Sequence, residues 1–233
     1  MCGKFTAMAS WAEVRAFSQP LTVESSGHND SEVTYRPYAM LPVIVWDSDL
    51  RTRKILRMRW GLPDPKNHKL LKHIHARAET IDTTRTFAPL FTQGRRGIVL
   101  MKTFNETPPE NSDQWTIDPN DGRARGFAFL CQGYNVEDGP DLLACCMVTV
   151  PANALLRETI LKTDPDPRMP AILEDQDWAV WLGENVPPLD QVKAVLRTME
   201  GENWTIAPEP KKPKPAKPKG PPKPRKPKEP PLF

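Results

Sequence analysis

The sequence predicts an α+β fold, with strands in the middle of the chain and helices flanking them. Apolar runs and period-two alternation concentrate between positions 41 and 150, and helical spacing of apolar residues occurs before and after that region. No internal repeat and no regular alternation of strand and helix is present, so a parallel α/β sheet is not predicted. Of the 233 residues 39% are hydrophobic, and we expect one domain over 1–207 with a separate tail over 208–233.

The strands are predicted from their apolar patterns. Leu56, Met58 and Trp60 alternate with Arg57 and Arg59, which is typical of a half-buried strand. Further strands are expected at 41–46, 97–101, 126–130 and 144–150.

The helices are predicted from a cap and from helical spacing. Residues 10–13 have the pattern of a capping box, and the helix that it opens would carry Trp11, Val14 and Phe17 inward. Further helices are expected at 152–161, 177–182 and 189–199.

The composition excludes membrane, disulfide-scaffold and zinc-finger proteins. No stretch approaches the roughly 18 apolar residues of a membrane-spanning helix, and the N-terminus lacks a secretory signal, so we expect a cytoplasmic protein. The four cysteines form no C-x-x-C pair and no zinc-ligand spacing. Cys131, Cys145 and Cys146 lie in apolar strand segments, where we expect buried, free and unreactive thiols.

The C-terminal tail has a composition of its own. Its 26 residues, 208–233, hold 11 prolines and a net charge of +7, and since the whole chain carries +3, residues 1–207 sum to −4. With almost nothing apolar to bury, the tail is predicted to be disordered with polyproline II character. It is either a solvated extension or an electrostatic tether for nucleic acid, and less favoured as a ligand for a proline-binding groove.

Cys2 has a chemical capacity that internal cysteines lack. The small side chain after Met1 permits removal of the initiator, which would leave an α-amine and a thiol on adjacent carbons. The amine condenses with an aldehyde to an imine, and the thiol then closes a five-membered thiazolidine. Both groups titrate near neutrality, at roughly 8 and 8.5. On position alone, however, the favoured interpretation of Cys2 is an N-terminal residue without a role.

Several short motifs occur in a fixed order along the chain. They are MCGKF at 1–5, WGLP at 60–63, ARAET at 76–80, TVPAN at 149–153 and RMPAIL at 168–173. Together they resemble the SRAP family, the SOS-response-associated peptidases or abasic-site-processing proteins, over about residues 2–185. The resemblance implies one domain around a distorted β-barrel, with a positively charged groove for single-stranded DNA. It also implies a thiazolidine crosslink between the N-terminal cysteine and the aldehyde of an abasic site.

The resemblance also implies roles for individual residues. Glu106 takes the place of the family's glutamate, a general acid and base, although alone it would be interpreted as a solvated loop carboxylate. Arg77 and Arg168 take the places of arginines that bind phosphate, and Lys4 stands where the family has arginine. Without the resemblance, an ion pair with a neighbouring carboxylate is the better interpretation of either arginine. Trp60 is either a base-stacking residue or a core residue.

The chain departs from the family pattern at four positions besides Lys4. His75 replaces an asparagine, Thr107 a tryptophan, Asp166 the histidine of the last motif, and Arg36 the asparagine of the usual tyrosine–asparagine pair. Proton transfer then depends on Asp166, whose charged form the neighbouring Arg168 favours, or on His75. These departures motivate an alternative, a family member that binds DNA or a partner without crosslinking. A weaker rival is a thiol peptidase that uses Cys2 with His75.

We therefore expect a sensor of abasic sites in single-stranded DNA, with Cys2, Glu106 and Asp166 catalytic. Its autoprocessing peptidase activity would amount to removal of Met1. We expect no membrane association, a monomer, and neither a metal nor a small-molecule cofactor. His68 and His73, together with His75, complete no familiar ligand set.

Overall fold

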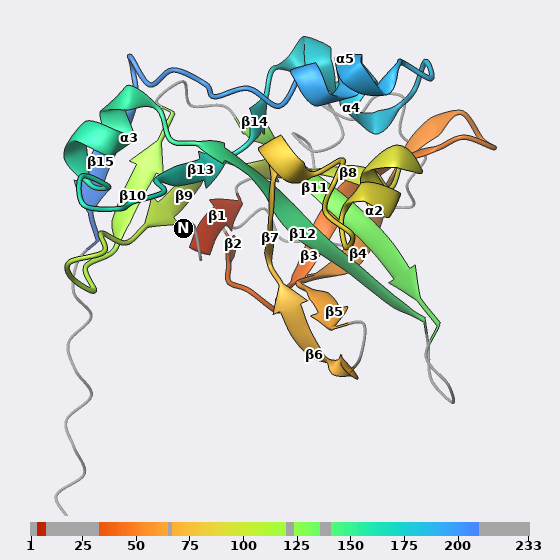
Figure 1. Cartoon of the computed structure of the whole chain (residues 1–233), viewed down its shortest axis with the longest axis horizontal. Helices are drawn as coiled ribbons and strands as arrows, with labels where there is room; N and C mark the ends of the chain where they lie inside the picture. The colour runs from red at the N-terminus through yellow and green to blue at the C-terminus, as the bar shows by residue number, and fades with distance from the viewer. Residues whose placement is uncertain (1–3, 8–32, 65–66, 120–123, 136–140, 210–233) are drawn as a thin grey trace, which may run out of the picture.

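The computed structural model describes residues 4–7, 33–64, 67–119, 124–135 and 141–209 (Figure 1). The fold is α+β, with a core made mostly of sheet and with short helices around it, as predicted. The helix expected to begin near residue 10 lies outside the described residues, and so does Cys2. No helix in the described part of the chain is long and apolar enough to cross a membrane.

An eight-stranded sheet forms the larger part of the core. Its strands are β3 (Met40–Asp47), β4 (Thr52–Trp60), β7 (His75–Arg77), β8 (Arg96–Met101), β11 (Arg125–Tyr134), β12 (Leu142–Pro151), β13 (Arg168–Pro170) and β14 (Ile172–Leu173). The pairings β12–β4, β4–β3, β3–β8, β8–β11 and β11–β12 close a ring of five strands. β12 pairs in parallel with β4 and β7, and its other pairings are antiparallel.

A five-stranded sheet carries the N-terminal strand in an interior position. Its order is β15 (Thr205–Pro208), β10 (Trp115–Asp118), β9 (Thr103–Glu106), β1 (Lys4–Ala7) and β2 (Val33–Tyr35). A separate hairpin joins β5 (Leu62–Asp64) to β6 (Asn67–His73), which leads into β7. β1 is therefore held on both sides, by β9 and by β2.

The helices are short and lie outside the sheets (Figure 1). They are η1 (Ala78–Thr80), α2 (Ala88–Thr92), α3 (Ala154–Thr159), η2 (Asp175–Asp177), α4 (Trp178–Leu182) and α5 (Leu189–Ala194). Asn153 begins α3, because its side-chain oxygen accepts from the amide of Leu156 at 3.0 Å. Gly183 ends α4 in the left-handed region, at φ 82°.

Aromatic side chains join the two sheets. The rings of Phe5 and Trp60 lie 4.9 Å apart, and those of Phe104 and Phe127 lie 6.0 Å apart. All four side chains are fully buried, and each pair has one member in each sheet. Burying such rings is a large part of the apolar contribution to stability, so the seam between the sheets belongs to the core.

The predicted strands are confirmed at β3, β4, β8, β11 and β12, and each extends beyond its predicted range, β4 and β11 by four residues or more. The helix expected at 189–199 ends at Ala194, which corrects that prediction. The following segment packs Leu196 and Met199 on the core without helix, and the carbonyl of Met199 accepts a bond from Asn153 at 3.0 Å. The carbonyl of Met199 is therefore hydrogen-bonded to a side chain and not to a backbone amide of a continuing helix.

Candidate functional site

Glu106 lies at the end of β9, next to the N-terminal strand. In the β1–β9 register Lys4 pairs with Asn105, and Phe5 pairs with Phe104. Because side chains alternate along a strand, Glu106 shares a face with the buried Phe104. Its side chain is only 1% exposed, so the interpretation as a solvated loop carboxylate is wrong. Cys2 is two residues before Lys4 in the sequence.

The opposite face of β9 is occupied by Asn105. Its amide nitrogen donates to Thr116 and to the carboxylate of Glu209, both at 2.8 Å. Glu209 follows β15, so these bonds tie the last described residues to the strand that carries Glu106. The sheet that positions Glu106 therefore extends to the end of the described chain.

Trp60 connects β1 to the segment that carries Arg77. Its ring lies 4.9 Å from the ring of Phe5 and 6.2 Å, edge-on, from the ring of His75. Its indole N–H donates to the carbonyl of Ile74 at 2.9 Å. Since Trp60 is fully buried, the structure supports the core interpretation of this residue over base stacking.

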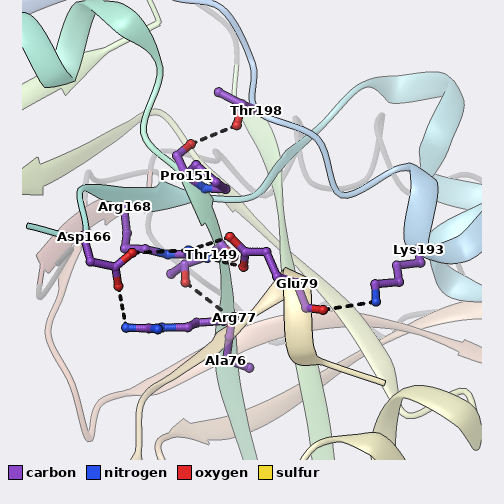
Figure 2. A network of polar contacts seen from close by, with 9 residues as sticks. All are labelled: Ala76, Arg77, Glu79, Thr149, Pro151, Asp166, Arg168, Lys193 and Thr198. Carbon is purple, nitrogen blue, oxygen red and sulfur yellow. Dashed lines mark hydrogen bonds and ion pairs between the residues drawn. The ribbon is translucent and has the colours of Figure 1, made fainter. Parts of the chain in front are cut away.

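Arg168 is the centre of a polar network beside β12 (Figure 2). Its two terminal nitrogens donate to the two carboxylate oxygens of Glu79 at 2.6 and 2.7 Å, a bidentate pair. One of them also donates to the carbonyl of Thr149 at 2.8 Å. Arg168 is 4% exposed, so it is a buried, ion-paired arginine.

Arg77 and Asp166 form the solvent-facing side of the same network (Figure 2). Arg77 donates to one carboxylate oxygen of Asp166, and Arg168 lies 3.8 Å from the other. The side chains of Arg77 and Asp166 are 59% and 46% exposed. Asp166 therefore bridges two arginines, and Arg77 is the one that solvent reaches.

Glu79 is the partner that the sequence analysis missed. Its hydrogen bonds from Arg168 hold the pKa of its carboxyl below the ordinary value. Lys193 on α5 donates to the carbonyl of Glu79 at 3.2 Å and to Asp82 at 2.7 Å, and the second bond lowers the pKa of Asp82. Glu79 lies inside the ARAET motif, which was the available signal.

The remaining thiols and histidines form no second centre. Cys131, Cys145 and Cys146 are free and buried, as predicted, and burial raises the pKa of Cys131 to about 12. His73 packs edge-on against Phe87 at 5.6 Å, whereas the side chain of His68 lies outside the described part of the structure. No cluster of three or more His, Cys, Asp or Glu within the described ranges could hold a metal ion.

The fold and this geometry define a class, an α+β protein with a buried carboxylate beside its N-terminal strand and an arginine–carboxylate network beside β12. The chain belongs to the SRAP family: the sequence model described as SOS response associated peptidase (SRAP) matches residues 1–212. The family prediction is therefore confirmed.

Curated relatives and solved structures agree with this assignment. The abasic site processing proteins YoqW and YobE of Bacillus subtilis (strain 168) are each 26% identical over 211 residues. These alignments cover 87% of this chain and 89% and 91% of the relatives. A crystal structure of a protein from Bordetella bronchiseptica has a TM-score of 0.72 at 19% identity, covering 90% of this chain and 100% of the other. At that identity the likeness shows the fold.

Proposed function

We propose that this protein detects abasic sites in single-stranded DNA and captures them covalently through Cys2, after removal of Met1. The relatives named for abasic site processing support the abasic-site part of the proposal. The observation that carries it is the burial of Glu106 at the end of β9, beside the strand that begins two residues after Cys2. Two residues span at most about 7 Å, so Cys2 is never far from Lys4 and its neighbour β9.

The chemistry needs an amine, a thiol and a proton carrier. The ring-opened sugar of an abasic site offers an aldehyde, to which the α-amine of Cys2 adds, and loss of one water gives an imine. The thiolate then adds to the imine carbon while the nitrogen takes up one proton, which closes the thiazolidine. Glu106 is the proposed acid that protonates the departing hydroxyl and the base that removes protons from the amine.

Arg77 is the principal phosphate contact in this proposal. It is exposed and already pairs with a carboxylate through one hydrogen bond, so a DNA phosphate can take the place of Asp166 and can bind the guanidinium bidentately. Arg168 adds positive charge from its buried position, and its ion pairs hold Asp166 and Glu79 in place. Lys4 is the third proposed DNA-binding residue, on the strand nearest to Cys2.

Asp166 is the proposed substitute for the family histidine. Once phosphate holds Arg77, the carboxylate of Asp166 is released from that partner and is able to accept a proton during opening or reversal. We further propose that the closed ring of five strands corresponds to the distorted barrel of the family, and that the tail adds nonspecific affinity for DNA.

A second candidate function is DNA binding without crosslinking. It is favoured by the ion pair between Arg77 and Asp166, because the family histidine is absent from the position next to the phosphate contact.

A denaturing gel with abasic single-stranded DNA separates the two candidates. Wild-type protein should give a heat-stable shifted band, and Glu106→Gln should form it at least about 100-fold more slowly. Cys2→Ser keeps the amine but lacks the thiol, so its adduct should survive the gel only after borohydride reduction. If wild-type protein gives no band while it still binds the DNA, the second candidate is correct.

A further inference from the structure

A cleft of about 920 Å³ lies between the β5–β6 hairpin, α2 and the end of β11. It is separate from the network around Arg168, because none of the residues of that network lines it. The hairpin leads into β7, and α2 packs on β11, so both walls adjoin strands of the eight-stranded sheet (Figure 1). A volume of this size accommodates one or two nucleotides or a drug-sized ligand.

The charged residues of the cleft are mainly cationic. Lys72, Arg85 and Arg95 line it, all exposed, against one carboxylate, Asp64, which lies 3.3 Å from Lys72. The charged lining thus sums to +2, whereas residues 1–207 sum to −4. A cationic cleft on an acidic body concentrates positive potential where an anion would enter.

The uncharged lining suits nucleotides better than a bare anion. The rings of His73 and Tyr134 border the cleft, together with the amides of Gln93 and Gln132. Aromatic faces stack on bases of any sequence, and amides bond to base edges. Burial raises the pKa of Tyr134 to about 12 and lowers the pKa of His73, so both rings favour their neutral forms at pH 7.

The cleft is close to the proposed phosphate contact. His73 and Arg77 are four residues apart, so their backbones are separated by at most about 14 Å. At the 3.4 Å rise of a stacked strand, that distance corresponds to about four nucleotides. The basic tail is no competitor for the cleft, because its net charge of +7 has the same sign.

Building on the proposed function, we propose that this cleft binds the single-stranded DNA flanking the abasic site, beginning within about four nucleotides of the phosphate that Arg77 contacts. The phosphates meet Lys72, Arg85 and Arg95, and one base stacks on Tyr134 or His73. The cleft therefore extends the DNA-binding surface beyond the crosslinking site and makes affinity depend on the length of one flank.

The test compares the triple variant Lys72→Gln/Arg85→Gln/Arg95→Gln with a charge-matched control, Arg51→Gln/Arg157→Gln/Lys162→Gln. The control residues are also exposed and do not line the cleft. Fluorescence anisotropy would measure the Kd for labelled oligonucleotides carrying a tetrahydrofuran abasic analogue, which cannot crosslink. The oligonucleotides have two or eight nucleotides on one side of the analogue, tested separately on the 5′ and 3′ sides.

With eight nucleotides on the correct side, the cleft variant should bind about 10-fold more weakly, and its salt slope should fall by about 2. With two nucleotides it should bind like the control. Equal weakening by the control variant, or no dependence on flank length, overturns the proposal. Competition by free dCMP below 1 mM also overturns it, because the cleft would then be a site for a small phosphate-bearing ligand.

Two further measurements separate a loss of DNA binding at the cleft from a folding defect and from a failure of the crosslinking hypothesis. The exposed single variant Arg85→Glu should weaken long-flank binding more than Arg85→Gln, with melting temperatures equal to wild type. Crosslinking is measured on separate, aldehyde-bearing DNA with short flanks. If wild-type protein never crosslinks but still shows flank-dependent binding, the proposed function fails and the cleft proposal stands.

Discussion

Asp166 stands where the proposed function places the family's histidine. Its carboxylate pairs with the exposed Arg77 and lies 3.8 Å from the buried Arg168. A histidine there would leave Arg77 without this partner, whereas aspartate offsets its charge in the absence of DNA. In the proposed function, DNA binding therefore includes the cost of exchanging a carboxylate for a phosphate at Arg77.

Replacing Asp166 by asparagine should strengthen binding to single-stranded DNA. An exposed ion pair contributes about 0.2–1 kcal/mol, so the Kd should fall about 1.4- to 5-fold for a non-crosslinkable oligonucleotide. Asp164→Asn is the control, because it removes one charge nearby but keeps the oxygen that accepts from the amide of Asp166. An equal fall in Kd for both variants would mean that affinity for DNA depends only on net charge and not on the ion pair between Arg77 and Asp166.

Replacing Glu79 by glutamine should destabilise the fold, because it removes the bidentate carboxylate partner of the buried Arg168 and leaves only the longer contact with Asp166. We expect a loss of about 1–2 kcal/mol in the free energy of unfolding at pH 7, measured by urea denaturation. The folded-state pKa of Glu79 lies below its ordinary 4.5. The contribution of Glu79 to the free energy of unfolding is therefore fully present above pH 4.5, and it is lost as the pH falls through the folded-state pKa of Glu79.

The difference between wild type and Glu79→Gln should accordingly shrink in acid. Glu158→Gln, at an exposed position, is the matched control and should change stability little at either pH. A difference that stays constant down to pH 3 would contradict the linkage to the Arg168 pair.

At the scale of elements, long strands were predictable and short ones were not. The apolar patterns at 56–60 and 144–150 lie within β4 and β12, strands of nine and ten residues, and each pattern was long enough to predict a strand by itself. β7 and β9, of three and four residues, are too short to show a period. They are strands because long-range pairing holds them, β7 against β12 and β9 between β1 and β10.

The packing of α4 on β11 depends on a glycine. A Cβ on Gly126 would lie 2.7 Å from the indole of Trp178, which is 2% exposed and has little room to move. Gly126→Ala should therefore lower the free energy of unfolding by about 1–3 kcal/mol, seen as a lower melting temperature. Gly133→Ala in the same strand is the control, because its Cβ would meet Leu143 at an ordinary 3.6 Å. Equal effects would contradict this account of the contact.

At the scale of the whole molecule, the site lies where segments distant in sequence converge. The sequence motifs were sufficient to select Arg77, Glu106, Asp166 and Arg168 as candidate site residues. Their partners were not predictable, because the pairing of Arg168 with Glu79 spans 89 positions and no local pattern encodes it. The burial of Glu106 likewise follows from the pairing of β9 with β1 and β10.

The tail should contribute affinity but not chemistry. The structure places the useful truncation after Glu209, because Pro208 is part of β15 and Glu209 bonds to Asn105. Deleting 210–233 removes nine cationic residues and one glutamate, so the salt slope of DNA binding should flatten and the Kd should rise. Crosslinking at saturating DNA should be unchanged. An unchanged salt slope would mean that the tail does not contact DNA.

The most direct test of the account is the intact mass of the protein before and after incubation with an abasic oligonucleotide. The account predicts that the free protein lacks Met1 and that the adduct equals protein plus oligonucleotide minus one water. Cys2→Ala should give no stable adduct. An adduct on protein that retains Met1, or a stable adduct with Cys2→Ala, would contradict capture through the N-terminal cysteine.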